Sequence, residues 1–86
     1  LLQDPDPRAR ETSAQALELL GGDIALAGLI RGLDDPMSRV RLSSATGVRK
    51  LGPEPAKASL ARLVLEDSSW EVRVQAAGPR GRSTVP

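Results

Sequence analysis

Apolar side chains recur along this chain at intervals of three and four residues, the spacing that lines one face of an α-helix. They do not alternate with polar residues as in a half-buried strand, and only 1% of the residues are aromatic. The pattern predicts helices over about 7–20 and 23–33, a second pair built on the same plan, and a shorter helix over 70–77. The side chains expected on the buried faces are Ala9, Ser13, Ala16, Leu17 and Leu20 in the first helix, Leu26, Leu29, Ile30 and Leu33 in the second, Val40, Ser44, Gly47, Val48 and Leu51 in the third, and Ala56, Leu60, Leu63 and Val64 in the fourth.

The ends of these predicted helices carry residues suited to such positions. Asp6 can accept hydrogen bonds from the free N–H groups of the opening turn, and Pro7 stands at the first helical position, where no N–H is needed. The Gly21-Gly22 pair supplies the backbone conformations that end a helix, and Ser69 is the predicted cap of the last one. Residues 78–86 are rich in Gly, Pro and Ser and have no apolar stripe, which predicts a disordered or non-native tail.

The chain also repeats itself. The segment Leu2-Gln3-Asp4-Pro5 returns as Leu33-Asp34-Asp35-Pro36 and, more loosely, as Leu65-Glu66-Asp67-Ser68. In each unit an Asp is followed six positions later by an Arg that has an apolar residue before it; the pairs are Asp4 and Arg10, Asp35 and Arg41, and Asp67 and Arg73. A nearly fixed period of roughly 30 residues is typical of stacked helical repeats.

Helical hairpins repeated at this period predict an all-α fold, an α-solenoid of two full helical hairpins plus a half repeat. We assign the repeats to approximately 2–32, 33–64 and 65–77, which together form one domain over 1–77, followed by the tail 78–86. The third unit is incomplete, so we expect the chain to be a fragment of a longer array.

These motifs resemble those of bacterial HEAT-like repeats, including the repeats of phycobilisome lyase subunits. The matching residues are Asp35-Pro36, Val40-Arg41, Leu20-Gly21 and the run from Ala25 to Ile30, and the resemblance covers Leu2 to about Ala77. It implies that the recurring Asp and Arg residues lie at the junctions between repeats. It also implies that the second helix of each hairpin lines the concave surface on which partners bind.

Composition argues against catalysis. The chain has no His and no Cys, so the commonest general base, a strong nucleophile and the usual metal ligands are missing. Adjacent acids such as Asp34-Asp35 suit backbone capping better than acid/base chemistry. We therefore predict no enzyme activity, no catalytic residues, no cofactor and no metal. No apolar stretch approaches the roughly 20 residues that span a bilayer, and the first residues lack the basic-then-apolar layout of a secretory signal, so we predict a cytoplasmic protein. Ten Arg against two Lys, in a sequence rich in Ala, Gly and Leu, indicate a bacterial source.

Three residues are candidates for binding a partner. Arg31 and Arg62 are one repeat apart, so they occupy equivalent places on the two second helices, where paired guanidinium groups would suit an acidic segment or phosphates. The alternative is that both are simply solvated charges. Trp70, at a helix start, is expected to be partly exposed and either anchors an interface or covers the open edge of the last repeat.

A nucleic-acid partner has less support. The third helix carries a run of four basic residues that predicts a basic patch on its outer side: Arg39, Arg41, Arg49 and Lys50. Helical-repeat DNA glycosylases bind DNA with a basic groove, but aromatic residues that stack on bases are absent here apart from Trp70. The net charge of +1 adds nothing to this interpretation.

The function that these observations predict is a non-catalytic protein-interaction or scaffolding module whose partner presents an acidic surface. An alternative is a non-catalytic repeat arm, or a lyase-like subunit, of an enzyme system that holds a substrate or a pigment. A further expectation is self-association through the ends of the stack, where Leu1, Leu2 and the unpaired third helix expose apolar surface.

Overall fold

The first two helices form a hairpin joined by a tight turn. In the computed structural model, which describes residues 3–78, α1 spans Pro7–Leu20 and α2 spans Gly22–Gly32. Asp6 caps α1 by accepting a hydrogen bond from the backbone N–H of Arg8 at 3.0 Å, as the sequence predicts. The turn between the helices needs Gly21 and Gly22, whose φ angles of 72° and 86° are rarely adopted by other residues.

The second hairpin and the half repeat follow the same plan. Helix α3 spans Ser38–Leu51, a 3₁₀ turn η1 spans Glu54–Ala56, α4 spans Lys57–Glu66 and α5 spans Trp70–Ala77. The Ser69 side chain caps α5 by accepting from the N–H of Val72, again as predicted. Helix α5 has 8 residues whereas α1 and α3 have 14 each, so the first helix of the third repeat is the shortest of the three.

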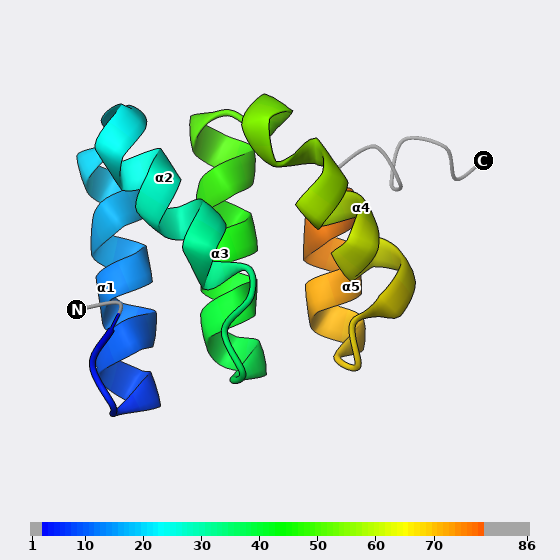
Figure 1. Cartoon of the computed structure of the whole chain (residues 1–86), viewed down its shortest axis with the longest axis horizontal. Helices are drawn as coiled ribbons and strands as arrows, with labels where there is room; N and C mark the ends of the chain where they lie inside the picture. The colour runs from blue at the N-terminus through cyan, green and yellow to red at the C-terminus, as the bar shows by residue number, and fades with distance from the viewer. Residues whose placement is uncertain (1–2, 79–86) are drawn as a thin grey trace.

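The helices lie in two layers. Helices α1, α3 and α5 stand side by side, and α2 and α4 lie in front of them (Figure 1). Helix α3 contacts α1, α2 and α5, while α4 packs against α5, so each second helix rests on the first helix of the following repeat. No strand occurs within residues 3–78. This arrangement confirms the predicted all-α solenoid of two full hairpins and a half repeat.

The core runs through the space between the two layers. Its buried members come from all three units: Ala14, Leu29, Leu33, Ala45, Val48, Ala56, Leu60, Leu63, Val72 and Ala76. Gly47 allows α2 and α3 to approach closely, because a Cβ at that position would lie only 2.7 Å from Cδ1 of Leu29. All the side chains predicted to lie on the buried faces of the second, third and fourth helices are buried or partly buried.

The predicted buried face of α1 is wrong in part. Ala14 is fully buried, although the sequence pattern omitted it, whereas Ala16 is exposed and Leu20 is 79% exposed. The cause is that α1 contacts α2 and α3 and has no preceding repeat on its other side within residues 3–78. Of the remaining predictions, Leu1, Leu2 and all of the tail after Gly78 lie outside the described residues, and the repeat boundaries stay predictions.

Candidate functional site

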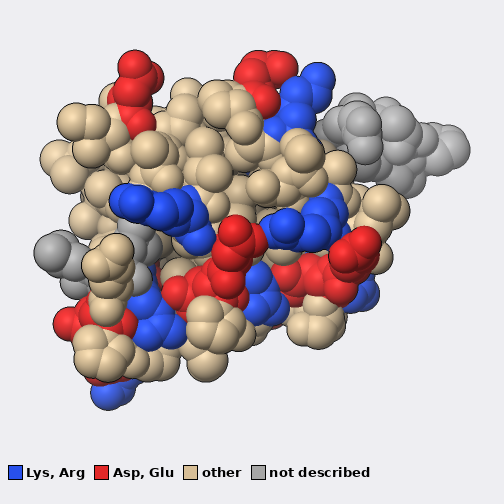
Figure 2. Space-filling view, viewed as in Figure 1, with Lys and Arg blue, Asp and Glu red and all other residues tan. Residues whose placement is uncertain are grey.

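The outward side of α2 and α4 carries the predicted arginines. Arg31 lies in the last turn of α2, where it is the helix's only basic residue, and it is exposed. Arg62 lies on α4 with a side chain that is 49% exposed. Figure 2 views this side of the molecule and shows basic side chains over both helices with acidic side chains between them.

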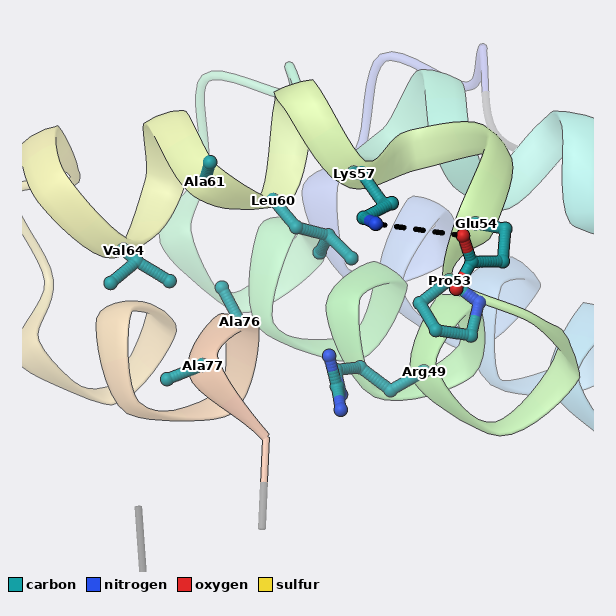
Figure 3. Close-up of a pocket in the computed structure, with 9 residues that line it drawn as sticks. All are labelled: Arg49, Pro53, Glu54, Lys57, Leu60, Ala61, Val64, Ala76 and Ala77. Atoms are coloured by element: carbon teal, nitrogen blue, oxygen red, sulfur yellow. Dashed lines mark ion pairs between the residues drawn. The ribbon is translucent and has the colours of Figure 1, made fainter. Parts of the chain in front are cut away.

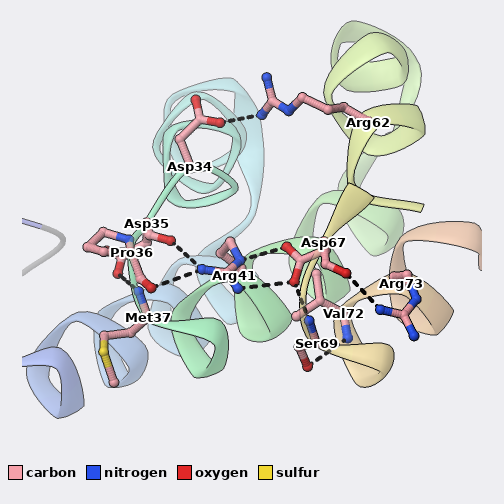
Figure 4. A network of polar contacts seen from close by, with 10 residues as sticks. All are labelled: Asp34, Asp35, Pro36, Met37, Arg41, Arg62, Asp67, Ser69, Val72 and Arg73. Carbon is pink, nitrogen blue, oxygen red and sulfur yellow. Dashed lines mark hydrogen bonds and ion pairs between the residues drawn. The ribbon is translucent and has the colours of Figure 1, made fainter. Parts of the chain in front are cut away.

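The two arginines differ in their electrostatic surroundings. Arg62 forms an ion pair through Nη2 with Oδ1 of Asp34, in the turn after α2 (Figure 4). Among the described residues, Arg31 forms no ion pair. The repeat explains the difference, because the first unit has the uncharged Gln3 at the place where the second has Asp34. Arg31 is therefore an uncompensated positive charge on this surface, whereas Arg62 is held by its own chain.

Trp70 does not join the arginines. It is the first residue of α5, in the other layer of helices, and its side chain is 64% exposed. Val74 lies one turn further along α5 and is 60% exposed. The two side chains leave apolar surface uncovered at the last helix of the stack, away from α2.

The recurring Asp and Arg residues join successive repeats. Nε and Nη2 of Arg10 contact the two carboxylate oxygens of Asp35 at 2.7 and 3.1 Å, and Arg41 contacts Asp67 in the same way at 2.7 and 3.0 Å. Nη1 of Arg10 also donates to the backbone carbonyl of Asp4 at 2.8 Å, within its own repeat. Figure 4 shows the second of these pairs, and Figure 2 shows the band of alternating charges to which they belong. These residues form structural junctions, as the resemblance implies.

The junction carboxylates have shifted pKa values. Burial raises the pKa of Asp35 and Asp67, but hydrogen bonds from the arginine and from a backbone N–H outweigh it, so both pKa values lie below the ordinary 3.8. A folded-state pKa below the unfolded one stabilises the fold fully above the unfolded pKa. That stabilisation is lost as the pH falls through the folded pKa.

We therefore expect the free energy of unfolding to be nearly constant between about pH 5 and 7 and to fall steeply below about pH 4. Urea denaturation followed by circular dichroism at several pH values measures this. An Asp67→Asn variant should be less stable at neutral pH, and its difference from the wild type should shrink in acid, because the wild-type carboxylate is then protonated. A constant difference across the pH range would contradict the assignment.

The predicted basic patch on α3 is largely neutralised. Nε of Arg39 contacts Oε1 of Glu11 at 3.2 Å, Nζ of Lys50 contacts Oε2 of Glu18 at 2.9 Å, and Arg41 is held by its junction carboxylate. Both glutamates come from α1, so the basic side of one helix meets the acidic side of its neighbour. This pairing weakens the nucleic-acid hypothesis.

A groove lies where α3, α4 and the end of α5 meet. It encloses about 310 Å³ and is lined by apolar side chains, including Leu60, Val64 and Ala76, and by the charged residues Arg49, Glu54 and Lys57. Figure 3 shows Arg49 at one side of it and the ion pair between Glu54 and Lys57, 3.7 Å apart, at the rim. Within residues 3–78, α5 has 8 residues and α3 has 14, so α5 contributes fewer turns beside α4 than α3 contributes beside α2.

The charged and polar groups of the groove are few among the described residues. The single acid in the groove is Glu54, which is paired with Lys57, and no nucleophile stands beside a base there. Within the described part of the chain, no His, Cys, Asp and Glu side chains gather in a group that could hold a metal ion. None of the helices in that part is long and apolar enough to cross a bilayer.

The sequence did not predict the Asp34 and Arg62 ion pair or the groove. Asp34 precedes Arg62 by 28 residues and has no acidic counterpart in the first unit, so the repeat gave no signal for the pair. The groove could have been inferred from the early helix end at Gly78, together with the longer first helices of the other units.

Comparison with known proteins adds one finding. A family model described as HEAT repeats matches residues 1–78, nearly the whole chain. No curated protein matches the sequence.

Proposed function

Because this chain belongs to the HEAT repeat family, whose members are generally protein-interaction or scaffold modules, we propose that it is a non-catalytic module that binds another protein. The surface that we assign to this role is the outward side of α2 and α4. Its partner presents an acidic segment, and the groups that contact this segment are the guanidinium groups of Arg31 and Arg62.

The observation that carries the proposal is the uncompensated charge of Arg31. Most other arginines of the described chain contact a carboxylate of a neighbouring element, including Arg10, Arg39, Arg41 and Arg62. Arg31 has none, because Gln3 stands where the next repeat has Asp34. A guanidinium without a carboxylate partner is free to bind a carboxylate of another protein with two parallel hydrogen bonds.

Arg62 can bind the same partner, but it contributes less to the binding free energy because it must first leave Asp34. Its ion pair with Asp34 is exposed on both sides, at 49% and 67%, and such pairs contribute only about 0–1 kcal/mol. A partner carboxylate can therefore replace Asp34 with little loss. One turn before each arginine the helix carries a small, exposed side chain, Ala27 before Arg31 and Ala58 before Arg62.

The proposal is tested by comparing the proteins captured from lysate by the wild type and by an Arg31→Glu/Arg62→Glu variant, using quantitative mass spectrometry. Proteins that bind through this surface should be depleted roughly tenfold or more, because each reversal places like charges together. A second variant, Gln3→Asp, leaves both arginines in place. It should deplete the same proteins more weakly by giving Arg31 a carboxylate of its own chain.

The matched control is Arg8→Glu/Arg39→Glu, which makes the same change in net charge on α1 and α3. Both side chains are exposed, at 90% and 75%. Circular dichroism establishes that all variants remain helical. A captured set that is unchanged in the Arg31→Glu/Arg62→Glu variant, or depleted equally in the control, would overturn the assignment of this surface.

A further inference from the structure

Ile24 is a large apolar residue on the surface that we assign to the partner. It lies in the first turn of α2, and its exposed fraction of 90% is the highest of any large apolar side chain in the described part of the chain. Isoleucine is branched at Cβ and forms helices less readily than alanine or leucine. Neither burial nor helix formation therefore accounts for an isoleucine at this position.

The exposure of Ile24 does not depend on which repeats stand beside it. The second hairpin follows it, with α3 packed against α2, and leaves Ile24 uncovered. Pro55, in η1, is the equivalent residue one repeat later, and it is also exposed although the first hairpin precedes it. A following repeat thus leaves this position open in one unit, and a preceding repeat leaves it open in the next. The packing of the solenoid itself keeps the position at the surface.

Ile24 shares one face of α2 with Arg31. Successive residues of an α-helix are turned by about 100°, so two residues that are seven apart point within about 20° of each other and lie about 10 Å apart along the axis. The exposed Ala27 stands between them on the same side. These three residues form a stripe, which we name the α2 stripe, with an apolar side chain at one end and a guanidinium at the other.

The α2 stripe has an uncharged part and a basic part. Figure 2 shows uncharged surface over α2, between an acidic side chain near the start of the helix and basic side chains across the middle of the molecule. Within residues 3–78, Arg31 forms no ion pair, so the basic part attracts a carboxylate. A carboxylate bound there leaves Ile24 uncovered, because Ile24 lies about two helical turns away. A segment that covers the whole stripe needs an apolar side chain as well.

A helical segment fits the length of the α2 stripe. In a helix, two residues that are seven apart share a face at a separation of about 10 Å, the same as that of Ile24 and Arg31. Side chains on one face of an extended strand stand about 7 or 13 Å apart instead. Helices that lay an apolar face on another protein are a recurrent mode of recognition.

We propose that the partner's acidic segment is a helix that also carries a large apolar side chain, which packs on Ile24 while a carboxylate of the same helix binds Arg31. This inference rests on the proposed function and adds the apolar half of the partner's chemistry. The carboxylate fixes the helix through two parallel hydrogen bonds. The apolar contact removes the Ile24 side chain from water and, unlike an ion pair, is not screened by salt.

Two synthetic peptides test the proposal in titrations of the isotope-labelled full chain followed by nuclear magnetic resonance. Both are blocked, alanine-rich helical peptides with two adjacent glutamates, and one has leucine seven residues from a glutamate where the other has serine. The leucine peptide should bind the wild type about tenfold more tightly, because its contact with Ile24 removes apolar surface from water. Its titration should shift the backbone signals of both Ile24 and Arg31.

Three variants assign the difference between the peptides to the α2 stripe. Ile24→Ser has nearly the same helix propensity as the wild type and should bind the two peptides equally. Val74→Ser makes a matched change on α5, in the other layer of helices, at a side chain that is 60% exposed, and should keep the tenfold difference. Arg31→Gln should weaken both peptides by a similar factor, since both carry the glutamates. Circular dichroism checks that each variant remains helical.

The outcomes separate this inference from the proposed function. If Arg31→Gln weakens both peptides but the wild type binds them equally, or if the preference for leucine persists in Ile24→Ser, the inference is overturned and the proposed function stands. Failure of both peptides to bind the wild type also overturns the inference. The capture experiment with Arg31→Glu/Arg62→Glu then decides the proposed function by itself.

Discussion

Replacing Asp67 with alanine is expected to remove about 3–5 kcal/mol from the free energy of unfolding. The Asp67 side chain is 3% exposed and that of Arg41 is 13% exposed, so the pair is shielded from water. Alanine would leave the Arg41 guanidinium buried without its carboxylate. It would also remove the hydrogen bond that Asp67 accepts from the N–H of Ser69 at the start of α5.

The size of the chain makes this loss severe. A domain of 86 residues buries only about 60–65% of the surface that its unfolded chain exposes, so its total stability is small. A loss of about 3–5 kcal/mol is comparable to the whole free energy of unfolding of a marginal domain. We therefore expect the Asp67→Ala variant to be largely unfolded at 25 °C, with a circular dichroism spectrum that has lost most of its helical signal.

Two further variants distinguish the stability lost with the buried ion pair from the general effect of removing an acidic side chain. Asp34→Ala breaks the exposed ion pair with Arg62 and should cost no more than about 1 kcal/mol. Asp67→Asn keeps an acceptor for the N–H of Ser69 but loses the charge, so its loss should lie between the other two. Equal losses for Asp67→Ala and Asp34→Ala in urea denaturation would show that burial of the pair is not what stabilises the junction.

Much of the fold could be predicted because the same physical requirement recurs in each repeat. Leu29 and Leu60 fill equivalent places, and the contact of Arg10 with Asp35 returns one repeat later as the contact of Arg41 with Asp67. The position of a residue on its own helix predicted its burial less well than its equivalence to a residue in another repeat. Ala14 is buried like Ala45, its counterpart in the second unit, whereas the stripe drawn from α1 alone included the exposed Leu20.

The candidate site was predictable only in part because the relevant charges are not repeated. The equivalence of Arg31 and Arg62 placed both arginines on the second helices, and they are indeed exposed there. Their different states depend on one exchange, Gln3 in the first unit for Asp34 in the second, which changes the net charge of the surface but leaves the helices as they are. A repeat pattern does not show which single residues are exchanged between units, so the structure was needed to find that Arg31 forms no ion pair with the described residues while Arg62 does.

Replacing Leu29 with alanine is expected to reduce the free energy of unfolding by about 3–5 kcal/mol, the second large effect. Leu29 is fully buried and packs where α2 meets α3, so the removed atoms leave a cavity between two repeats. Leu19→Ala is the matched control, because it removes the same atoms from a side chain that is 86% exposed. At concentrations where the chain is monomeric, Leu19→Ala should change the stability by less than about 0.5 kcal/mol.

Gly47 tests whether the Leu29 loss comes from that cavity. When Leu29 is present, the new Cβ of a Gly47→Ala variant would lie 2.7 Å from Cδ1 of Leu29. This crowding should outweigh the gain of about 1 kcal/mol in helix propensity. In the Leu29→Ala background the same methyl group enters the cavity, and Gly47→Ala should become stabilising by about 1 kcal/mol. A double-mutant cycle in urea measures this reversal of sign, and additive effects of the two substitutions would contradict the packing of Leu29 against Gly47.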